Sequence, residues 1–214
     1  MSHKLYALES NEDVYNAVLE EAKRNASEYI LDPRYPSAIA YMVAVVHKTL
    51  GYSPRLYFPS RDVEPVEPMD VMYKSIGISS RLDIVLEERS IGGYREAVLV
   101  DTTPSPIDYS SFQKIGIGKI TVYRVVEDKE PLTRYLDNNE IIYLSKKVYE
   151  KIRSYYERKQ QLTIALKAPA LLGYLLGYQI GHIDHTILYY STVYGRYIEV
   201  CVKELLTRAT QILS

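Results

Sequence analysis

The spacing of hydrophobic residues along the chain predicts helices that alternate with short apolar strands. Val14, Val18 and Ala22 recur at helical intervals. Ser10 and Asp13, just before them, have the spacing of a capping box, so an amphipathic helix begins here. Further helices are predicted over residues 38–50, 71–78, 107–114, 139–160 and 168–182. Strands are predicted over residues 28–31, 54–58, 81–88, 96–101, 119–128, 161–166 and 185–191.

This order of elements predicts an α/β fold with a mostly parallel sheet and helices on both of its faces. We expect residues 1–137 to form an α/β domain and residues 138–160 to form a connecting helix on its surface. Residues 161–214 then add a strand–helix–strand–helix extension that packs into the same body. The stretch 196–203 fits a helix or a hairpin strand equally well.

Composition narrows the class of protein. With 214 residues, 25% of them charged, the chain is long enough for one sizeable core. The net charge of −1 argues against a protein whose main task is to grip phosphate backbones. One cysteine gives neither a disulfide framework nor a thiolate metal site. No membrane span or export signal is visible, so we expect a cytoplasmic protein.

Acidic residues stand at the ends of several predicted strands. Asp32, Asp101 and Asp128 each fall at the carboxyl end of one strand. Ligands bind at this edge in parallel α/β sheets, so the three carboxylates could converge there. The alternative is that strand-end aspartates cap turns through their side-chain oxygens.

Three segments in this order resemble motifs of the DHH phosphoesterase superfamily, which includes the RecJ nucleases. The first is YILDPRYPSAIAYMVAVVHKTLGYSPRLYF, which is followed by EPVEPMDVMYKSIGI. The second is AVLVDTTPSP, an apolar strand that ends in Asp-Thr, and the third is ITVYRVVEDKEP, in the place of the Asp-His-His strand. The resemblance covers about residues 12–131. It implies two manganese ions, held by Asp and His, and a hydroxide that attacks phosphorus.

The residues needed to hold those metals are mostly missing. Matching the family's serine to Ser37 puts Tyr29, Leu31 and Pro33 at metal positions. A shift by one residue recovers an aspartate but places an arginine beside it, and a guanidinium repels a dication. The resemblance therefore implies a vestigial site with no metal and no catalysis, formed by Asp32, Arg34, Asp101, Glu127 and Asp128.

A DHH-like chain without metal ligands is most similar to the RecJ-like factors of archaeal DNA replication. That resemblance implies a non-catalytic scaffold that binds the GINS complex and, through it, the MCM helicase, as the counterpart of the C subunit of the CMG helicase. It also implies weak contact with single-stranded DNA at most, and no cofactor. A variant of this interpretation is an active, metal-dependent DHH phosphodiesterase.

A different class is suggested by the second half of the chain. LTIALKAPALLGYLLGYQIGHIDHTILYYS, followed by YGRYIEV, is similar to the SAVED and CARF domains of prokaryotic immunity. Those domains sense cyclic oligonucleotides in a pocket. This alternative implies that Lys167, Tyr190 and Tyr194 face a cavity.

The densest group of potential metal ligands is the HIDH segment. His182, Asp184 and His185 stand close enough in the sequence to join in binding a metal. They also lie at the end of a helix, where such residues often cap. His47 lies inside an apolar helix, where we expect a buried histidine with satisfied hydrogen bonds.

Overall fold

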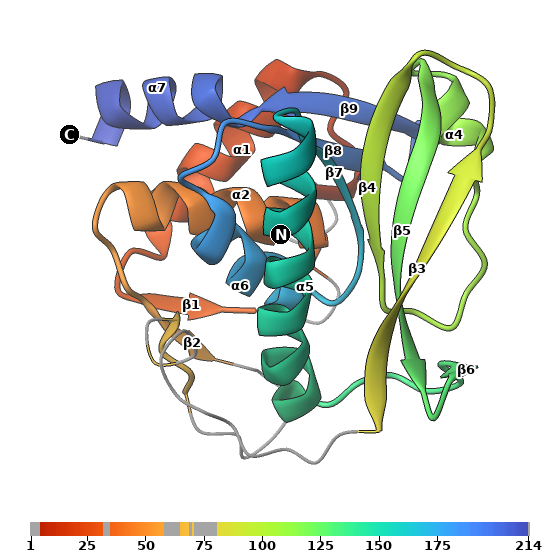
Figure 1. The fold of residues 1–214 in the computed structure, drawn as a ribbon. Coiled ribbons are helices and arrows are strands. Elements are labelled where there is room, and N and C mark those ends of the chain that lie inside the picture. The colour runs from red at the N-terminus through yellow and green to blue at the C-terminus, as the bar shows by residue number, and fades with distance from the viewer. Residues whose placement is uncertain (1–4, 32–34, 58–64, 69, 71–80, 214) are drawn as a thin grey trace.

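Helices and strands alternate along most of the chain (Figure 1). The structure is a computed structural model that describes residues 5–31, 35–57, 65–68, 70 and 81–213. The helices are α1 (Asn11–Arg24), α2 (Ser37–Thr49), α4 (Ser110–Gln113), α5 (Asn138–Lys159), α6 (Ala170–Ile180) and α7 (Val202–Leu213). The strands are β1 (Glu28–Ile30), β2 (Arg55–Tyr57), β3 (Leu82–Ser90), β4 (Arg95–Asp101), β5 (Ile117–Glu127), β6 (Glu130–Pro131), β7 (Thr163–Lys167), β8 (Thr186–Ser191) and β9 (Arg196–Cys201).

The main sheet is mixed, with the strand order β3-β5-β4-β7-β8-β9. The three central pairings, β5–β4, β4–β7 and β7–β8, are parallel, whereas β3 and β9 run antiparallel at the two edges. The sequence predicted a mostly parallel sheet, but the observed sheet is mixed, because the strands at both of its edges are antiparallel to their neighbours. β9 is antiparallel to β8 because only a short turn joins them, and a short turn can connect antiparallel strands but not parallel ones.

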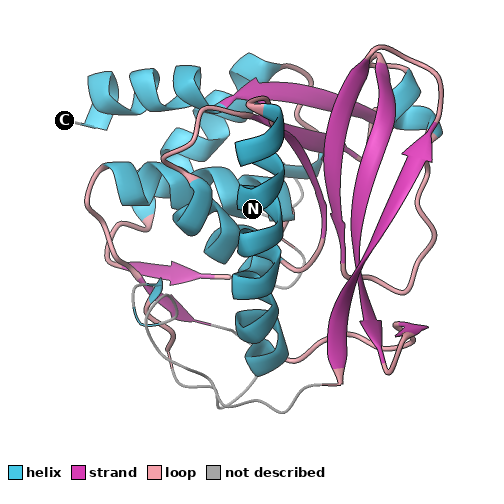
Figure 2. Cartoon of the chain, in the orientation of Figure 1, coloured by secondary structure: helices cyan, strands magenta, loops and turns pink. Residues whose placement is uncertain are grey.

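Most helices cover one face of the main sheet, here called the first face (Figures 1 and 2). Val98 and Val100 of β4 belong to the core on that face. Ala97 and Leu99 alternate to the second face, where they join a smaller core with Phe112 of α4. Helices therefore flank the sheet unequally, with α4 alone of the described helices on the second face.

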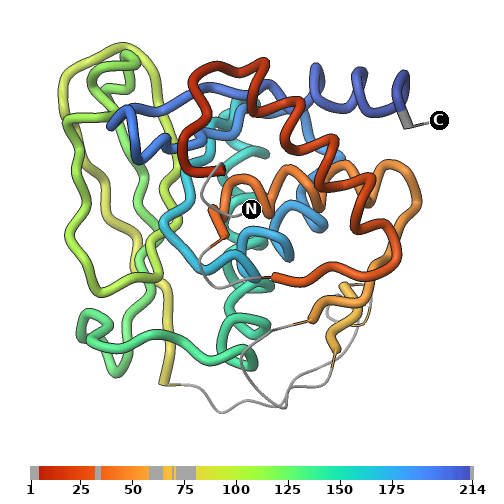
Figure 3. Tube along the Cα trace, turned by 180° about the vertical axis from the view of Figure 1, so that it is seen from behind, coloured from red at the N-terminus to blue at the C-terminus, as the bar shows by residue number. Residues whose placement is uncertain are grey.

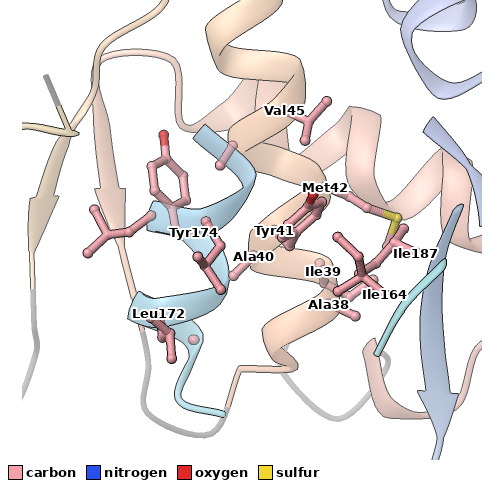
Figure 4. Packing of buried hydrophobic residues seen from close by; sticks show 14 of the residues in the cluster. Ala38, Ile39, Ala40, Tyr41, Met42, Val45, Ile164, Leu172, Tyr174 and Ile187 are labelled. Carbon is pink, nitrogen blue, oxygen red and sulfur yellow. The ribbon is translucent and has the colours of Figure 1, made fainter. Parts of the chain in front are cut away.

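A separate two-stranded parallel sheet is formed by β1 and β2. The strand that precedes Asp32 therefore does not belong to the main sheet, contrary to the expectation from its apolar pattern. The first-face core lies between the two sheets, and α2 lies inside it. Residues Ser37 to His47 of α2 are all buried. Figure 4 shows the reason, because α6 packs on one side of α2 while Ile164 and Ile187 of the main sheet lie on the other.

Helices α2 and α6 run parallel and touch through their backbones. A Cβ atom added to Gly173 would overlap the carbonyl of Ser37, and one added to Gly177 would overlap that of Tyr41. Residue numbers increase in the same direction along both helices in these contacts, so the two N-termini lie at the same end of the pair. Glycine is required because no other residue lets two helix backbones approach this closely.

Several sequence predictions are confirmed at their boundaries. Ser10 and Asp13 form the capping box of α1, which lies beside α7 in Figure 3. The ambiguous stretch 196–203 consists of the whole of β9 and the first two residues of α7. The helix expected over 71–78 lies outside the described residues. The division at residues 137 and 160 stays a prediction, although β7 pairs directly with β4 in one sheet.

No helix among the described residues is long and apolar enough to cross a bilayer. The cytoplasmic location stays a prediction.

Candidate functional site

The carboxyl ends of β4 and β7 meet the first turns of α2 and α6 at one edge of the main sheet. Asp101 pairs with Lys167 in the strand register, and the Thr102 N–H donates to the Lys167 carbonyl at 3.0 Å. The Ser37 hydroxyl donates to the carbonyl of Leu166 at 3.3 Å, which ties the start of α2 to the end of β7. We call this group of strand ends and helix starts the carboxyl-edge site.

Asp101 is the buried centre of the charges at this site. Its side chain is 1% exposed and lies 3.6 Å from the guanidinium of Arg124 and 3.9 Å from the Lys167 ammonium. The backbone N–H and the hydroxyl of Thr103 donate to the same carboxylate. Two cations therefore face one carboxylate, although Glu87 also lies 3.3 Å from Arg124.

Lys167 holds the loop that follows β4. Its ammonium group donates to the carbonyls of Ser105 and Pro106, on the second face of the sheet. Burial lowers the pKa of Lys167, and the charge of Asp101 opposes that effect. The lysine is thus a partly desolvated cation at the end of a strand.

Among the described residues, no side chain caps the backbone N–H groups in the first turns of α2 and α6. The helices follow Pro36 and Pro169, and neither has a side-chain cap or an acidic residue in its first turn. Such N-termini carry partial positive charge and favour anions. Strand alternation places Thr102 on this side, and within the described part of the chain its buried Oγ1 has no hydrogen-bond partner. The edge therefore offers donors on the first face and cations on the second.

The other carboxylates of the expected vestigial site do not join Asp101. Glu127 lies three residues beyond Arg124 on β5, about 10 Å along the strand, and on the opposite face. Its carboxylate pairs instead with Arg134, which lowers its pKa. Asp128 lies in the turn to β6 and pairs with the exposed Arg81 at 3.5 Å.

Two residues of that expected site, Asp32 and Arg34, lie outside the described residues. The convergence of Asp32 with Asp101 is therefore not placed by the structure.

The HIDH segment is arranged for packing. The His185 ring is buried, its Nδ1–H donates to the Ile183 carbonyl at 2.6 Å, and its Nε2 accepts from the Tyr41 hydroxyl at 2.6 Å. Neither ring nitrogen is left to bind a metal. His182 and Asp184 are exposed, and the described ranges contain no group of three His, Cys, Asp or Glu side chains that could hold a metal ion.

The three residues expected to face a cavity are spread over two places. Lys167 and Tyr190 lie on the second face of neighbouring strands, and Tyr190 contacts the ring of Tyr197 at 5.0 Å. Tyr194 lies in the turn after β8 and donates its hydroxyl to Glu9.

Two cavities lie at the opposite edge of the sheet, at the amino ends of its parallel strands. The larger, of about 580 Å³, lies among the starts of β4, β7 and β8 and the end of α5. Three of its charged lining residues are paired, since Lys159 lies 3.1 Å from Glu96 and Arg95 lies 2.5 Å from Glu199. The smaller, of about 440 Å³, lies between α7 and the ends of α2 and α6. Because the chemistry gathers at the carboxyl edge, we place the candidate site there.

Sequence reasoning found part of this site and missed the rest. It identified Asp101 from its place at a strand end and Lys167 from a resemblance. It missed Arg124 and Thr102. The paired helix starts carried a signal, because Pro36 and Pro169 each open an apolar helix without acidic residues.

No protein-family profile and no curated protein sequence matches the chain. Solved structures do match its fold. One is the Cap4 SAVED/CARF-domain receptor of Acinetobacter baumannii with the cyclic trinucleotide 3'3'3'-cAAA, at a TM-score of 0.59 and 16% identity over 90% of this chain and 43% of that one. The same receptor with 2'3'3'-cAAA gives a TM-score of 0.57 and 15% identity over 89% and 41%. The Moraxella osloensis receptor gives 0.52 and 15% over 89% and 42%.

These likenesses show the fold and correct the main prediction. The chain spans less than half the length of the receptors that it matches. The resemblance to the DHH superfamily and the RecJ-like replication factors is wrong, because the matching structures are SAVED/CARF-domain receptors. The expected partners, GINS, MCM and single-stranded DNA, are wrong with it, since the ligands in two of those structures are cyclic trinucleotides.

Proposed function

We propose that this chain is a sensor domain that binds a cyclic oligonucleotide at the carboxyl-edge site. The observation that carries the proposal is the fold match, which extends over about nine-tenths of the chain to receptors whose structures hold cyclic trinucleotides. The proposal assigns binding and no chemical step. The absence of catalysis stays part of the proposal.

The chemistry of the edge supports an anionic ligand. Each linkage of a cyclic oligonucleotide carries one negative charge, and the first turns of α2 and α6 point partial positive charge to one place. The buried hydroxyl of Thr102, which has no partner among the described residues, supplies a hydrogen-bonding group beside them. Lys167 adds a full positive charge within reach of the same strand ends. A net charge of −1 for the whole chain fits local recognition of this kind better than a grip on long nucleic acid.

Thermal unfolding with and without ligand tests the proposal. We expect 3'3'3'-cAAA or 2'3'3'-cAAA at one hundred times its dissociation constant to stabilise the fold by about 2.7 kcal/mol. For a domain of this size that raises Tm by about 5 to 10 °C. The linear trinucleotide of the same sequence is the control and should give a smaller shift. If no cyclic oligonucleotide shifts Tm or gives heat in calorimetry, the proposed function is wrong.

A lysine substitution locates the ligand on the protein. Lys167→Gln removes the cation at the carboxyl edge and should weaken binding by about tenfold, as expected for the loss of one charge-assisted contact. Lys159→Gln is the matched control, because Lys159 is also paired with a carboxylate but lies at the opposite edge. Equal losses in both variants would place the ligand elsewhere.

A further inference from the structure

Two tyrosine–histidine hydrogen bonds lie in the core around α2 and α6. Tyr174 of α6 lies 2.8 Å from Nδ1 of His47 on α2. Tyr41 of α2 lies 2.6 Å from Nε2 of His185, just before β8 in the strand–helix–strand unit that contains α6. All four side chains are at most 4% exposed. Each helix thus sends a tyrosine to a histidine of the other helix's unit.

The outer nitrogen of each ring fixes the direction of these bonds. Nε2 of His47 lies 3.0 Å from the carbonyl of Ala22 and must donate to it, so Nδ1 accepts from the Tyr174 hydroxyl. His185 has the opposite tautomer, since its Nδ1–H donates to a carbonyl and its Nε2 accepts from Tyr41. Both rings are neutral, because burial lowers each pKa to about 4. Both nitrogens of each ring already take part in a hydrogen bond.

The two tyrosines occupy equivalent places near the helix starts. Each is the fifth residue after the proline that opens its helix, about 7 Å along the helix axis. The backbone contacts of Gly173 and Gly177 lie in the same two turns. The glycines let the helices approach at fixed points. The hydrogen bonds add to this register, because sliding would leave a buried donor and acceptor unpaired.

We infer that Tyr41 and Tyr174 are positioning residues for the ligand. Their hydrogen bonds hold α2 and α6 in one register and thereby set the distance between the two helix N-termini at the carboxyl edge. This inference rests on the proposed function. It predicts that removal of one hydroxyl, more than 5 Å from the site along the helix, weakens binding without removing any ligand contact.

The experiment compares Tyr→Phe variants in the whole chain. Tyr41→Phe and Tyr174→Phe each delete one of the two hydroxyls. Tyr15→Phe is the matched control, because Tyr15 is equally buried and donates to Glu204 at 2.9 Å, but lies on α1. Calorimetry with 3'3'3'-cAAA, at a pH where every variant is fully folded, measures affinity. Hydrogen exchange of the free protein, followed in peptides 36–50 and 169–181, measures the helix pair without ligand.

The expected result is specific to the two interface tyrosines. The dissociation constant should rise at least about fivefold for Tyr41→Phe and Tyr174→Phe, a typical size for coupling between separate places in a protein. Exchange should become faster in both peptides, including the helix that was not mutated. Tyr15→Phe should lower the unfolding midpoint but change neither affinity nor exchange in these peptides.

The outcomes separate this inference from the proposed function. Wild-type affinity for both Phe variants overturns the inference. If the wild type binds no cyclic oligonucleotide, the proposed function fails, and unchanged exchange in the unmutated helix still overturns the inference. If both Phe variants fail to fold, His47→Gln and His47→Leu replace them. The amide can accept from Tyr174 and should retain affinity that leucine loses, whereas equal affinities contradict the inference.

Discussion

Acid should destabilise this protein well above the pH at which its carboxylates are protonated. The reason is that two buried histidines, His47 and His185, can take up a proton only when the chain unfolds. Burial lowers the pKa of His47 and of His185 to about 4, from an ordinary value of 6.5. In the unfolded chain both rings take up a proton as the pH falls below about 6.5. The stability that they contribute is therefore fully present above that pH and is lost as the pH falls toward 4.

The size of the loss follows from the two pKa values. Between pH 7.5 and pH 5.0 proton binding stabilises the unfolded state by about 2 kcal/mol per histidine, whereas it stabilises the folded state by almost nothing. Two such groups together remove about 4 kcal/mol from the free energy of unfolding, a large part of the stability of an ordinary domain. Acidic side chains with a lowered pKa also lose stability in acid, but they add little in this interval, because pH 5.0 still lies above their ordinary pKa of about 4.

Urea unfolding at the two pH values measures this loss directly. His47→Gln and His185→Gln should each reduce the difference between pH 7.5 and pH 5.0 by about 2 kcal/mol, whatever each costs at pH 7.5. His182→Gln is the matched control, because His182 is exposed and belongs to the same segment as His185. A wild type whose stability is equal at both pH values, or variants that keep the full difference, would refute the reasoning.

Two further predictions concern packing and charge. Gly177→Ala should lower the free energy of unfolding by at least about 3 kcal/mol, because its Cβ would overlap the Tyr41 carbonyl and the helices would have to separate. Gly51→Ala, where the space is open but φ is 75°, should cost about 1 kcal/mol in the same urea assay. Asp101→Asn should cost about 3 kcal/mol, because it leaves two cations beside a buried neutral group, whereas Glu127→Gln, at a solvated ion pair, should cost clearly less. Equal costs in either pair would contradict the corresponding prediction.

The sequence was informative about elements because local rules decide them. The capping box of Ser10 and Asp13 marks the start of α1, and a second box at Asp137 and Glu140 marks the start of α5. The predicted helix over 139–160 agrees with α5 to within one residue at each end. Apolar period and capping act within a few residues, so a single sequence contains the information that they need.

Sheet membership could not be read in the same way. The strand at residues 28–31 and the strand at 161–166 are both short and mostly apolar, yet β1 pairs in the small sheet and β7 lies in the middle of the large one. Strand pairing is decided by contacts between distant residues, and an apolar strand does not specify its neighbour. The expected gathering of Asp101 with Asp128 failed for a different reason. β4 and β5 are neighbours, but β5 continues three residues past Arg124, the register partner of Asp101, so Asp128 lies beyond the edge at which β4 ends.

The misleading resemblance and the alternative that the fold match supports have one physical origin. Any parallel strand–helix–strand unit ends its first strand near a turn, often with Asp, Ser or Thr, so a few such motifs in order resemble many unrelated α/β families. In two of these units, β1-α2-β2 and β7-α6-β8, the helices pack in parallel against each other. Their N-termini consequently open at one edge, and any ligand bound there meets residues from both halves of the chain. A site divided between two such units leaves no complete motif in either of them. Pro36 and Pro169 mark the starts of α2 and α6 in the sequence, but only the fold shows that the two starts lie at one edge.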